Sequence, residues 1–179
     1  MAKWNLDPEH TAAIFEVRHM MVTWVAGRFE KIAGTLYFDP ANVAAASVTV
    51  EIEAASISTG HERRDADLRS ANYLDVDRFP QINFQSTNVV IAGLDHCKVE
   101  GNLFLHGVTR PVTLDVRYAG PAYFQDDDRR YTTFGFRATT EVNREDFEMR
   151  KHLAIEEGGF MVGKHFAITI NVEADLADD

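Results

Sequence analysis

A histidine and an arginine, His106 and Arg110, lie in one short predicted turn that also contains Gly107. Imidazole can transfer protons or bind a metal ion near neutral pH, and a guanidinium group binds carboxylates and phosphates. The runs on both sides of the turn are mostly apolar, and from Pro111 onward the side chains alternate between apolar and polar. Such alternation is typical of a half-buried antiparallel strand. The turn therefore joins two strands and carries more chemistry than a plain hairpin needs.

Seven histidines raise the question of a metal site. A helical zinc motif places two histidines four residues apart, but the residue four positions after His61 is Asp65. His19, His106 and His165 lie on different predicted strands, so they could meet in space, although their spacing does not select such a site. We therefore predict no metal ion and no cofactor.

Nucleophilic catalysis is also poorly supported by the sequence. Cys97 is the only cysteine, and its neighbour His96 points to the opposite face of a strand, so the two cannot form a catalytic pair. The chain contains no nucleophile elbow, P-loop or dinucleotide fingerprint. We predict that the protein is not an enzyme.

Three charged groups interrupt apolar or turn segments: Arg64 with Asp65, Arg110, and the segment 143–147. One interpretation is that these arginines pair with nearby carboxylates or tie loops to backbone carbonyls. The other is that they form a polar rim for the head group of a ligand. The residues alone leave both interpretations open.

The elements that position these residues are predicted to be strands throughout most of the chain, because apolar side chains recur with a period of two. The predicted strands cover residues 11–19, 22–29, 32–38, 47–54, 81–91, 97–106, 111–119, 131–142 and 165–175. The charged residues 126–130 are predicted to form a solvated hairpin tip, and residues 173–179 a frayed tail.

One segment is predicted to be helical. Residues 61–70 are rich in charge, and Thr59 and Glu62 have the spacing of a capping box. Asp65 and Arg69 are four residues apart, a spacing that favours an ion pair on a helix. Residues 39–46 are predicted to contain one further helical turn.

Length and charge narrow the class of protein. A chain of 179 residues fits a single domain, for which we predict the bounds 1–179. A net charge of −10 argues against nucleic acid and anionic lipid surfaces as partners, and no apolar run is long enough for stable membrane insertion. The first residues lack the apolar core of a secretory signal, so we expect a cytoplasmic protein, or a periplasmic one if a leader has been removed.

Many antiparallel strands with one apolar face form either a sandwich or a closed barrel. Phenylalanines occur on nearly every predicted strand, and a barrel of eight strands has an interior large enough for one small ligand. The phenylalanines could equally fill a core. Periodicity marks a buried face without saying what touches it, so cavity and filled core both remain open.

A series of motifs occupies residues 4–7, 15–19, 27–29, 34–39, 56–60, 64–70, 79–84, 101–112 and 143–147, which include Gly101-x-Leu-x-Leu-His106-Gly107 and Asn143-Arg144-x-Asp146-Phe147. In this order the motifs resemble those of the YceI-like family of lipocalin-like bacterial proteins that bind polyisoprenoid lipids. The resemblance covers nearly the whole chain. This chain differs from the usual family pattern at Asp67, at residues 72–74 and at Glu148.

The resemblance implies an all-β fold, an antiparallel eight-stranded lipocalin-like barrel with one or two short helices. Its interior would be a hydrophobic tube for a long prenyl or similar lipid chain. The interior side chains expected to bind the chain are Phe15, Val17, Phe29, Val50, Ile52, Phe84, Leu103, Leu105, Leu114, Val116, Phe134, Phe136, Ile168 and Ile170. The candidates for head-group contacts are Arg64, His106 and Arg144.

The implied function is non-enzymatic binding, storage or transport of a long-chain isoprenoid or similar amphiphilic lipid. Each buried CH₂ contributes about 0.8 kcal/mol, so a long chain can bind tightly with few polar anchors. The alternative is an enzyme that acts on a prenyl-type substrate in the same cavity, with His19 or His106 as acid and base. A third option is a structural dimerisation module, because exposed strands such as 131–142 can pair between chains. The resemblance also suggests a homodimer.

Overall fold

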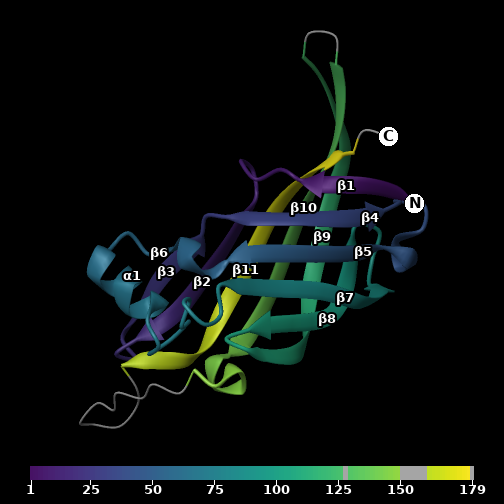
Figure 1. Ribbon diagram of the computed structural model, residues 1–179. Helices are drawn as coiled ribbons and strands as arrows, with labels where there is room; N and C mark the ends of the chain where they lie inside the picture. The colour runs from purple at the N-terminus through teal and green to yellow at the C-terminus, as the bar shows by residue number, and fades with distance from the viewer. Residues whose placement is uncertain (127–128, 150–160, 178–179) are drawn as a thin grey trace.

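The computed structural model describes residues 1–126, 129–149 and 161–177. Strands dominate this part of the chain (Figure 1). In chain order the elements are β1 Ala2–Leu6, β2 Ala12–His19, β3 Thr23–Phe29, β4 Ile32–Phe38, η1 Val43–Ala45, β5 Ser47–Glu53, η2 Ala54–Ser56, β6 Ile57–Ser58, α1 Glu62–Arg69, β7 Gln81–Ile91, β8 His96–Leu105, β9 Val108–Asp126, β10 Arg129–Asn143, η3 Arg144–Phe147 and β11 Val162–Leu176. The η elements are short 3₁₀ helices.

The strands form one closed antiparallel barrel. The hydrogen-bonded order runs β1-β4-β5-β7-β8-β9-β10-β11, and β11 pairs again with β1. β2 pairs with β11 and β3, and β6 pairs with β3, so β1/β2, β3/β4 and β5/β6 act as three interrupted strands. With β7 to β11 they make an eight-stranded barrel in which each strand pairs with its neighbour in sequence. The predicted fold class is confirmed.

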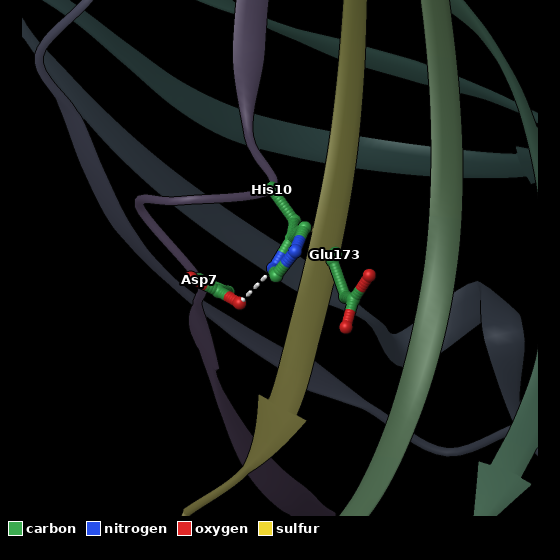
Figure 2. Close-up of side chains that lie close together, drawn as sticks. All are labelled: Asp7, His10 and Glu173. Carbon is green, nitrogen blue, oxygen red and sulfur yellow. Dashed lines mark hydrogen bonds and ion pairs between the residues drawn. The ribbon is translucent and has the colours of Figure 1, made fainter.

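The first interruption lies between β1 and β2, opposite residues 172–173 of β11. The amide of Asp7 donates to the carbonyl of Glu173 (2.8 Å), and pairing with β11 resumes at Ala12 opposite Asn171. In the turn, Nδ1 of His10 lies 2.6 Å from Oδ2 of Asp7 (Figure 2). These bonds satisfy polar groups where the sheet ladder is broken.

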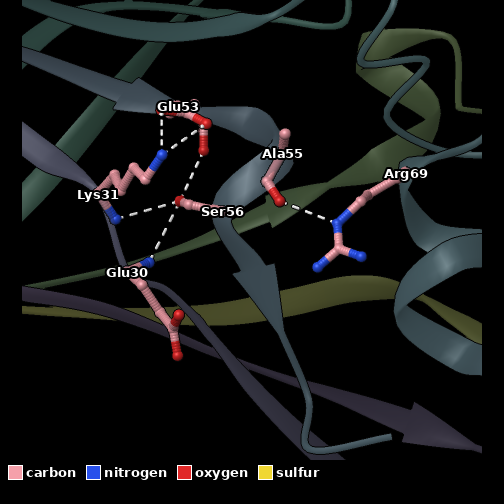
Figure 3. A network of polar contacts seen from close by, with 6 residues as sticks. All are labelled: Glu30, Lys31, Glu53, Ala55, Ser56 and Arg69. Carbon is pink, nitrogen blue, oxygen red and sulfur yellow. Dashed lines mark hydrogen bonds and ion pairs between the residues drawn. The ribbon is translucent and has the colours of Figure 1, made fainter. Parts of the chain in front are cut away.

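The other two interruptions lie beside each other and are joined by Ser56. Its hydroxyl accepts hydrogen bonds from the amides of Glu30 (3.2 Å) and Lys31 (3.1 Å), while Nζ of Lys31 pairs with the carboxylate of Glu53 (Figure 3). Arg69 ties α1 to the same place through Nε, which donates to the carbonyl of Ala55 (2.8 Å). The single α-helix of the described residues is thereby held against one end of the barrel.

Some sequence predictions were wrong in detail. Residues 2–6 form a strand that the sequence pattern did not predict, and β11 continues to Leu176, so residues 173–176 are not a frayed tail. The capping box does not form: Thr59 donates through its amide and hydroxyl to the carboxylate of buried Asp65 instead, and the structure records no cap from the side chain of His61.

The expected pair of Asp65 and Arg69 is also absent from the described contacts. The reason is that the Arg69 guanidinium donates to the carbonyls of Ala55 and Ile57, whereas Asp65 accepts from Thr59. The predicted hairpin tip at 126–130 lies partly outside the described residues. The strands β9 and β10 that lead to it project beyond the barrel (Figure 1). Among the residues described, no helix is both long and apolar enough to cross a membrane.

Candidate ligand-binding cavity

The barrel encloses a cavity of about 250 Å³. Its wall is formed by inward-facing side chains from every strand of the barrel, almost all of them apolar. Cavities of this size far exceed the small voids of a packed core, and an apolar cavity of ~150 Å³ already binds benzene. A filled core does not describe this interior. Instead, the barrel contains space that a hydrophobic molecule can occupy.

All of the predicted interior side chains except Phe134 line this cavity. Phe134 is 2% exposed and packs at one end of the barrel, where its ring lies 5.1 Å from the ring centroids of both Trp4 and Phe38 in edge-to-face contacts. The indole Nε1 of Trp4 donates to the carbonyl of Phe38 (3.0 Å). We call these three residues the aromatic plug, because they close the end of the cavity where β1 meets β11.

Two glycines make room for aromatic rings in the wall. A Cβ at Gly27 would lie 2.4 Å from Cζ of Phe15, and a Cβ at Gly101 would lie 2.4 Å from Cζ of Phe84. Both distances are impossible for real atoms, so a side chain at either glycine would displace the ring. The glycines thus make room in the wall for the rings of Phe15 and Phe84.

The opposite end of the cavity contains Arg144, which is 2% exposed and lines the cavity. It is the first residue of η3 and follows directly after β10. Nε donates to the carbonyl of Gly163 (3.0 Å) and Nη2 to that of Val162 (3.4 Å), while Nη1 donates to that of Met149. The fold thus encloses a guanidinium group beside apolar side chains.

The other two predicted head-group residues are not brought to the cavity wall. Arg64 lies on the outer side of α1, where Nε donates to the hydroxyl (2.6 Å) and Nη2 to the carbonyl (3.0 Å) of Thr59. Nδ1 of His106 lies 2.9 Å from the carbonyl of Phe147, and its ring packs against Phe79. Arg64 and His106 therefore hold loops in place in this structure.

Sequence reasoning missed several polar residues of the wall, among them Ser47, Tyr118 and Thr140. Thr140 could have been found, because it is in phase with Phe136 and Ala138 on β10. Residues 72–74, where the chain differs from the family pattern, also contribute to the cavity wall, since Tyr73 and Leu74 both line the cavity. Glu148, a third departure, ends η3 in a left-handed conformation with φ 62°.

Cys97 is buried in the cavity wall, and this burial raises the pKa of its thiol. The neighbouring His96 lies outside, where Nε2 is 3.0 Å from both carboxylate oxygens of Asp115. The two side chains occupy opposite faces of β8, as the strand period predicts. A thiol with a raised pKa in an apolar wall is a poor nucleophile.

Within the described residues, one group of metal-ligand types converges: Asp7, His10 and Glu173, whose ligand atoms lie within 4.8 Å of one another (Figure 2). The group is on the outside of the barrel. Hydrogen bonds explain the arrangement of this group. One carboxylate oxygen of Asp7 is hydrogen-bonded to Nδ1 of His10, and the other accepts a hydrogen bond from the amide of Glu9 (2.8 Å). The same bond raises the pKa of His10 and lowers that of Asp7.

An antiparallel barrel around one apolar cavity is the architecture of lipocalin-like proteins, which hold small hydrophobic molecules. The comparison with known sequences is more specific. The YceI-like domain model matches residues 4–174, and the chain belongs to the YceI-like family. Protein YceI of Salmonella newport is 38% identical over 154 residues, which cover 85% of this chain and 78% of that protein.

Solved structures share the fold. BcnA of Burkholderia cenocepacia superposes with a TM-score of 0.78 at 22% identity, covering 94% of this chain and 98% of that chain. A polyisoprenoid-binding domain from Saccharophagus degradans, implicated in plant cell wall breakdown, gives a TM-score of 0.70 at 12% identity and covers 99% of this chain and 100% of that chain.

Proposed function

We propose that the protein binds a long-chain isoprenoid or a similar amphiphilic lipid inside the barrel and stores or carries it without chemical change. The observation that carries this proposal is the apolar cavity of about 250 Å³ that runs along the inside of the barrel. The resemblance in fold to a domain that binds polyisoprenoid agrees with it.

The energy of such binding comes from the chain of the ligand. Each CH₂ removed from water contributes about 0.8 kcal/mol, so ten buried carbons contribute about 8 kcal/mol before the cost of association. A wall of aliphatic and aromatic side chains fits this ligand class, because it offers few polar groups that a polar molecule would need. The inward faces of β7 and β8 supply much of this wall through Phe84, Leu103 and Leu105.

The cavity wall favours binding over catalysis. No histidine is among the described residues that line it, and His106, one candidate acid or base, is engaged with the carbonyl of Phe147. The buried Cys97 thiol has a raised pKa. A prenyl-converting enzyme would need a proton-transfer group within hydrogen-bond reach of its substrate. Turnover of a prenyl substrate that is lost in His19→Ala or His106→Ala would favour the enzyme instead.

The proposal is tested by extracting natively purified protein with organic solvent and analysing the extract by mass spectrometry. We expect a long-chain lipid near one molecule per chain. Leu103→Asp places a charge in the wall and should abolish retention, whereas Asn102→Asp places the same charge on the exposed face of β8 and should not.

A second variant separates loss of ligand from loss of fold. Ala138→Phe adds a ring to the cavity wall without adding charge, so it should exclude the lipid while the barrel remains folded by circular dichroism. A wild-type protein that yields no lipid, and that binds none when lipid is supplied, would contradict the proposed function.

A further inference from the structure

Arg144 is a buried cation that is compensated by hydrogen bonds but not by charge. Its three nitrogens donate to the carbonyls of Gly163, Val162 and Met149. Carbonyl groups satisfy N–H donors, yet they carry no net charge. Across residues 1–126, 129–149 and 161–177, no carboxylate forms an ion pair with this guanidinium.

An uncompensated charge in an apolar site is costly, because water no longer screens it and the effective dielectric constant is low. Among the other buried charged residues, Asp75 pairs with Arg78 (3.4 Å). Within the described residues Asp65, like Arg144, is compensated by hydrogen bonds alone, which come from the amide and hydroxyl of Thr59. Arg144 differs from Asp65 in that it lines the cavity, where a bound ligand can supply the opposite charge.

Arg144 lies at the end of the cavity that is opposite the aromatic plug. The inward-facing residues of β10 alternate along the strand, and Arg144 continues the same phase. They are Phe134, Phe136, Ala138, Thr140, Val142 and Arg144. The series begins with aromatic rings at the plug and ends with Val142 and the guanidinium group of Arg144. A chain laid along this face would have its apolar end at the plug and its polar end at Arg144.

We propose that Arg144 recognises an anionic head group, a carboxylate or phosphate, on the chain bound in the cavity. This inference rests on the proposed function and names the chemical class of its ligand. A guanidinium group has five N–H donors, of which three donate to carbonyls of the described residues, so within that part of the chain each Nη keeps one N–H for an oxyanion. Hydrogen bonds between charged partners are roughly twice as strong as neutral ones, and the anion would also neutralise the buried cation.

The test compares three ligands with the same chain: hexadecanoic acid, hexadecyl phosphate and hexadecanol. Radiolabelled ligand is measured by equilibrium dialysis against delipidated full-length protein near neutral pH, at which the acid and the phosphate are ionised. We expect at least one of the two anions to bind about tenfold or more tightly than the alcohol. The carboxylate and phosphate arms identify which anion is preferred.

The variants assign this preference to Arg144. Arg144→Gln should lower the affinity for the anion about tenfold more than the affinity for the alcohol, and Arg144→Lys should keep part of the preference because it keeps the charge. Arg64→Gln, which removes the exposed guanidinium on α1, is the matched control and should keep the full preference.

The outcomes separate the two proposals. If none of the three ligands binds, the proposed function fails. If the alcohol binds as tightly as both anions to the wild type, or if folded Arg144→Gln keeps the preference, lipid binding stands and the role of Arg144 is overturned. Should Arg144→Gln not fold, the comparison of acid with alcohol in the wild type and in Arg144→Lys decides.

Discussion

Gly101 leaves the space that the Phe84 ring occupies in the wall of the barrel. A methyl group there would lie 2.4 Å from the ring and 2.6 Å from the carbonyl oxygen of Gln85, and the backbone oxygen cannot move easily. We expect Gly101→Ala to lower the free energy of unfolding by about 1–3 kcal/mol. Gly135→Ala is the control, since nothing lies within 4 Å of its Cβ position.

Urea denaturation of both variants measures this difference. Gly135→Ala should change the free energy of unfolding by less than about 1 kcal/mol, and in the stabilising direction, because alanine restricts the unfolded chain. Equal destabilisation by both substitutions would mean that the ring of Phe84 does not determine the need for glycine at residue 101.

The Asp7 and His10 pair makes stability depend on pH in a defined direction. The hydrogen bond to Asp7 raises the pKa of His10 above its ordinary value of 6.5, so its contribution is present below pH 6.5 and is lost as the pH rises through the folded value. The same bond lowers the pKa of Asp7 below 3.8, so that contribution is lost as the pH falls through the folded value.

We therefore expect the pair to stabilise the fold between the two ordinary values, 3.8 and 6.5. His10→Gln should destabilise the protein within this window and much less at alkaline pH, as measured by urea denaturation at both conditions. An NMR titration should place the pKa of His10 above 6.5, and Asp7→Asn should return it toward that value. A His10 resonance that titrates at or below 6.5 in the wild type would contradict the account.

Among the elements, β4 contributes Phe38 to the aromatic plug that closes the cavity. The Phe38 side chain is 2% exposed, and its ring contacts the rings of Phe134, Phe136 and Tyr118. Phe38→Ala should cost about 3–5 kcal/mol of stability and open the cavity further along the barrel. Tyr37→Ala changes the adjacent, exposed residue of the same strand and should cost far less.

Two quantities are measured: the free energy of unfolding, and the length of prenyl chain beyond which the affinity no longer rises. If the plug limits the cavity, Phe38→Ala should accept a longer chain than the wild type, whereas Tyr37→Ala should not. An unchanged chain-length limit in folded Phe38→Ala would show that another part of the barrel sets it.

The period-two pattern predicted most strands, because one face of each strand packs inward and the other meets water. It missed β1, whose five residues are too few to show a period, and it did not detect the early start of β9. Local signals failed where another hydrogen-bond partner competed. Thr59 has the spacing of a capping residue, but its hydrogen bonds go to Asp65.

The candidate site, too, could be predicted only in part. The alternation of apolar and polar residues predicts which strand side chains line the cavity, but the sequence does not reveal which polar residue of a loop is buried. Arg64 and Arg144 both belong to charged loop segments, and only Arg144 continues the inward phase of a strand. The pairing of β10 with β11, which brings Gly163 and Val162 to Arg144, joins residues more than fifteen positions apart and has no local signature.

For the molecule as a whole, Cys97 offers a single reporter of cavity occupancy. It is the only cysteine, it is buried, and it lies in the wall. In delipidated protein, N-ethylmaleimide should label it slowly, because burial hinders access and raises the pKa of the thiol. A bound lipid should slow labelling further, by about tenfold, as followed by intact mass. Cys97→Ala should show no labelling at all.

A labelling rate that is the same with and without bound lipid would place the ligand elsewhere. In that case the apolar interior would serve only the fold, and an outer surface of the barrel would have to bind the lipid. Ala138→Phe, which should exclude the lipid from the cavity, should also remove the difference in labelling rate between protein with and without added lipid, and it thereby links the two measurements.

The central claim is that the interior of the barrel holds a long apolar chain, and a chain-length series tests it most directly. Delipidated protein is titrated with prenyl alcohols of increasing length, and the dissociation constant is measured for each. At about 0.8 kcal/mol per buried CH₂, affinity should rise roughly fourfold per carbon until the cavity is full and then level off. An affinity that does not depend on chain length would contradict the account.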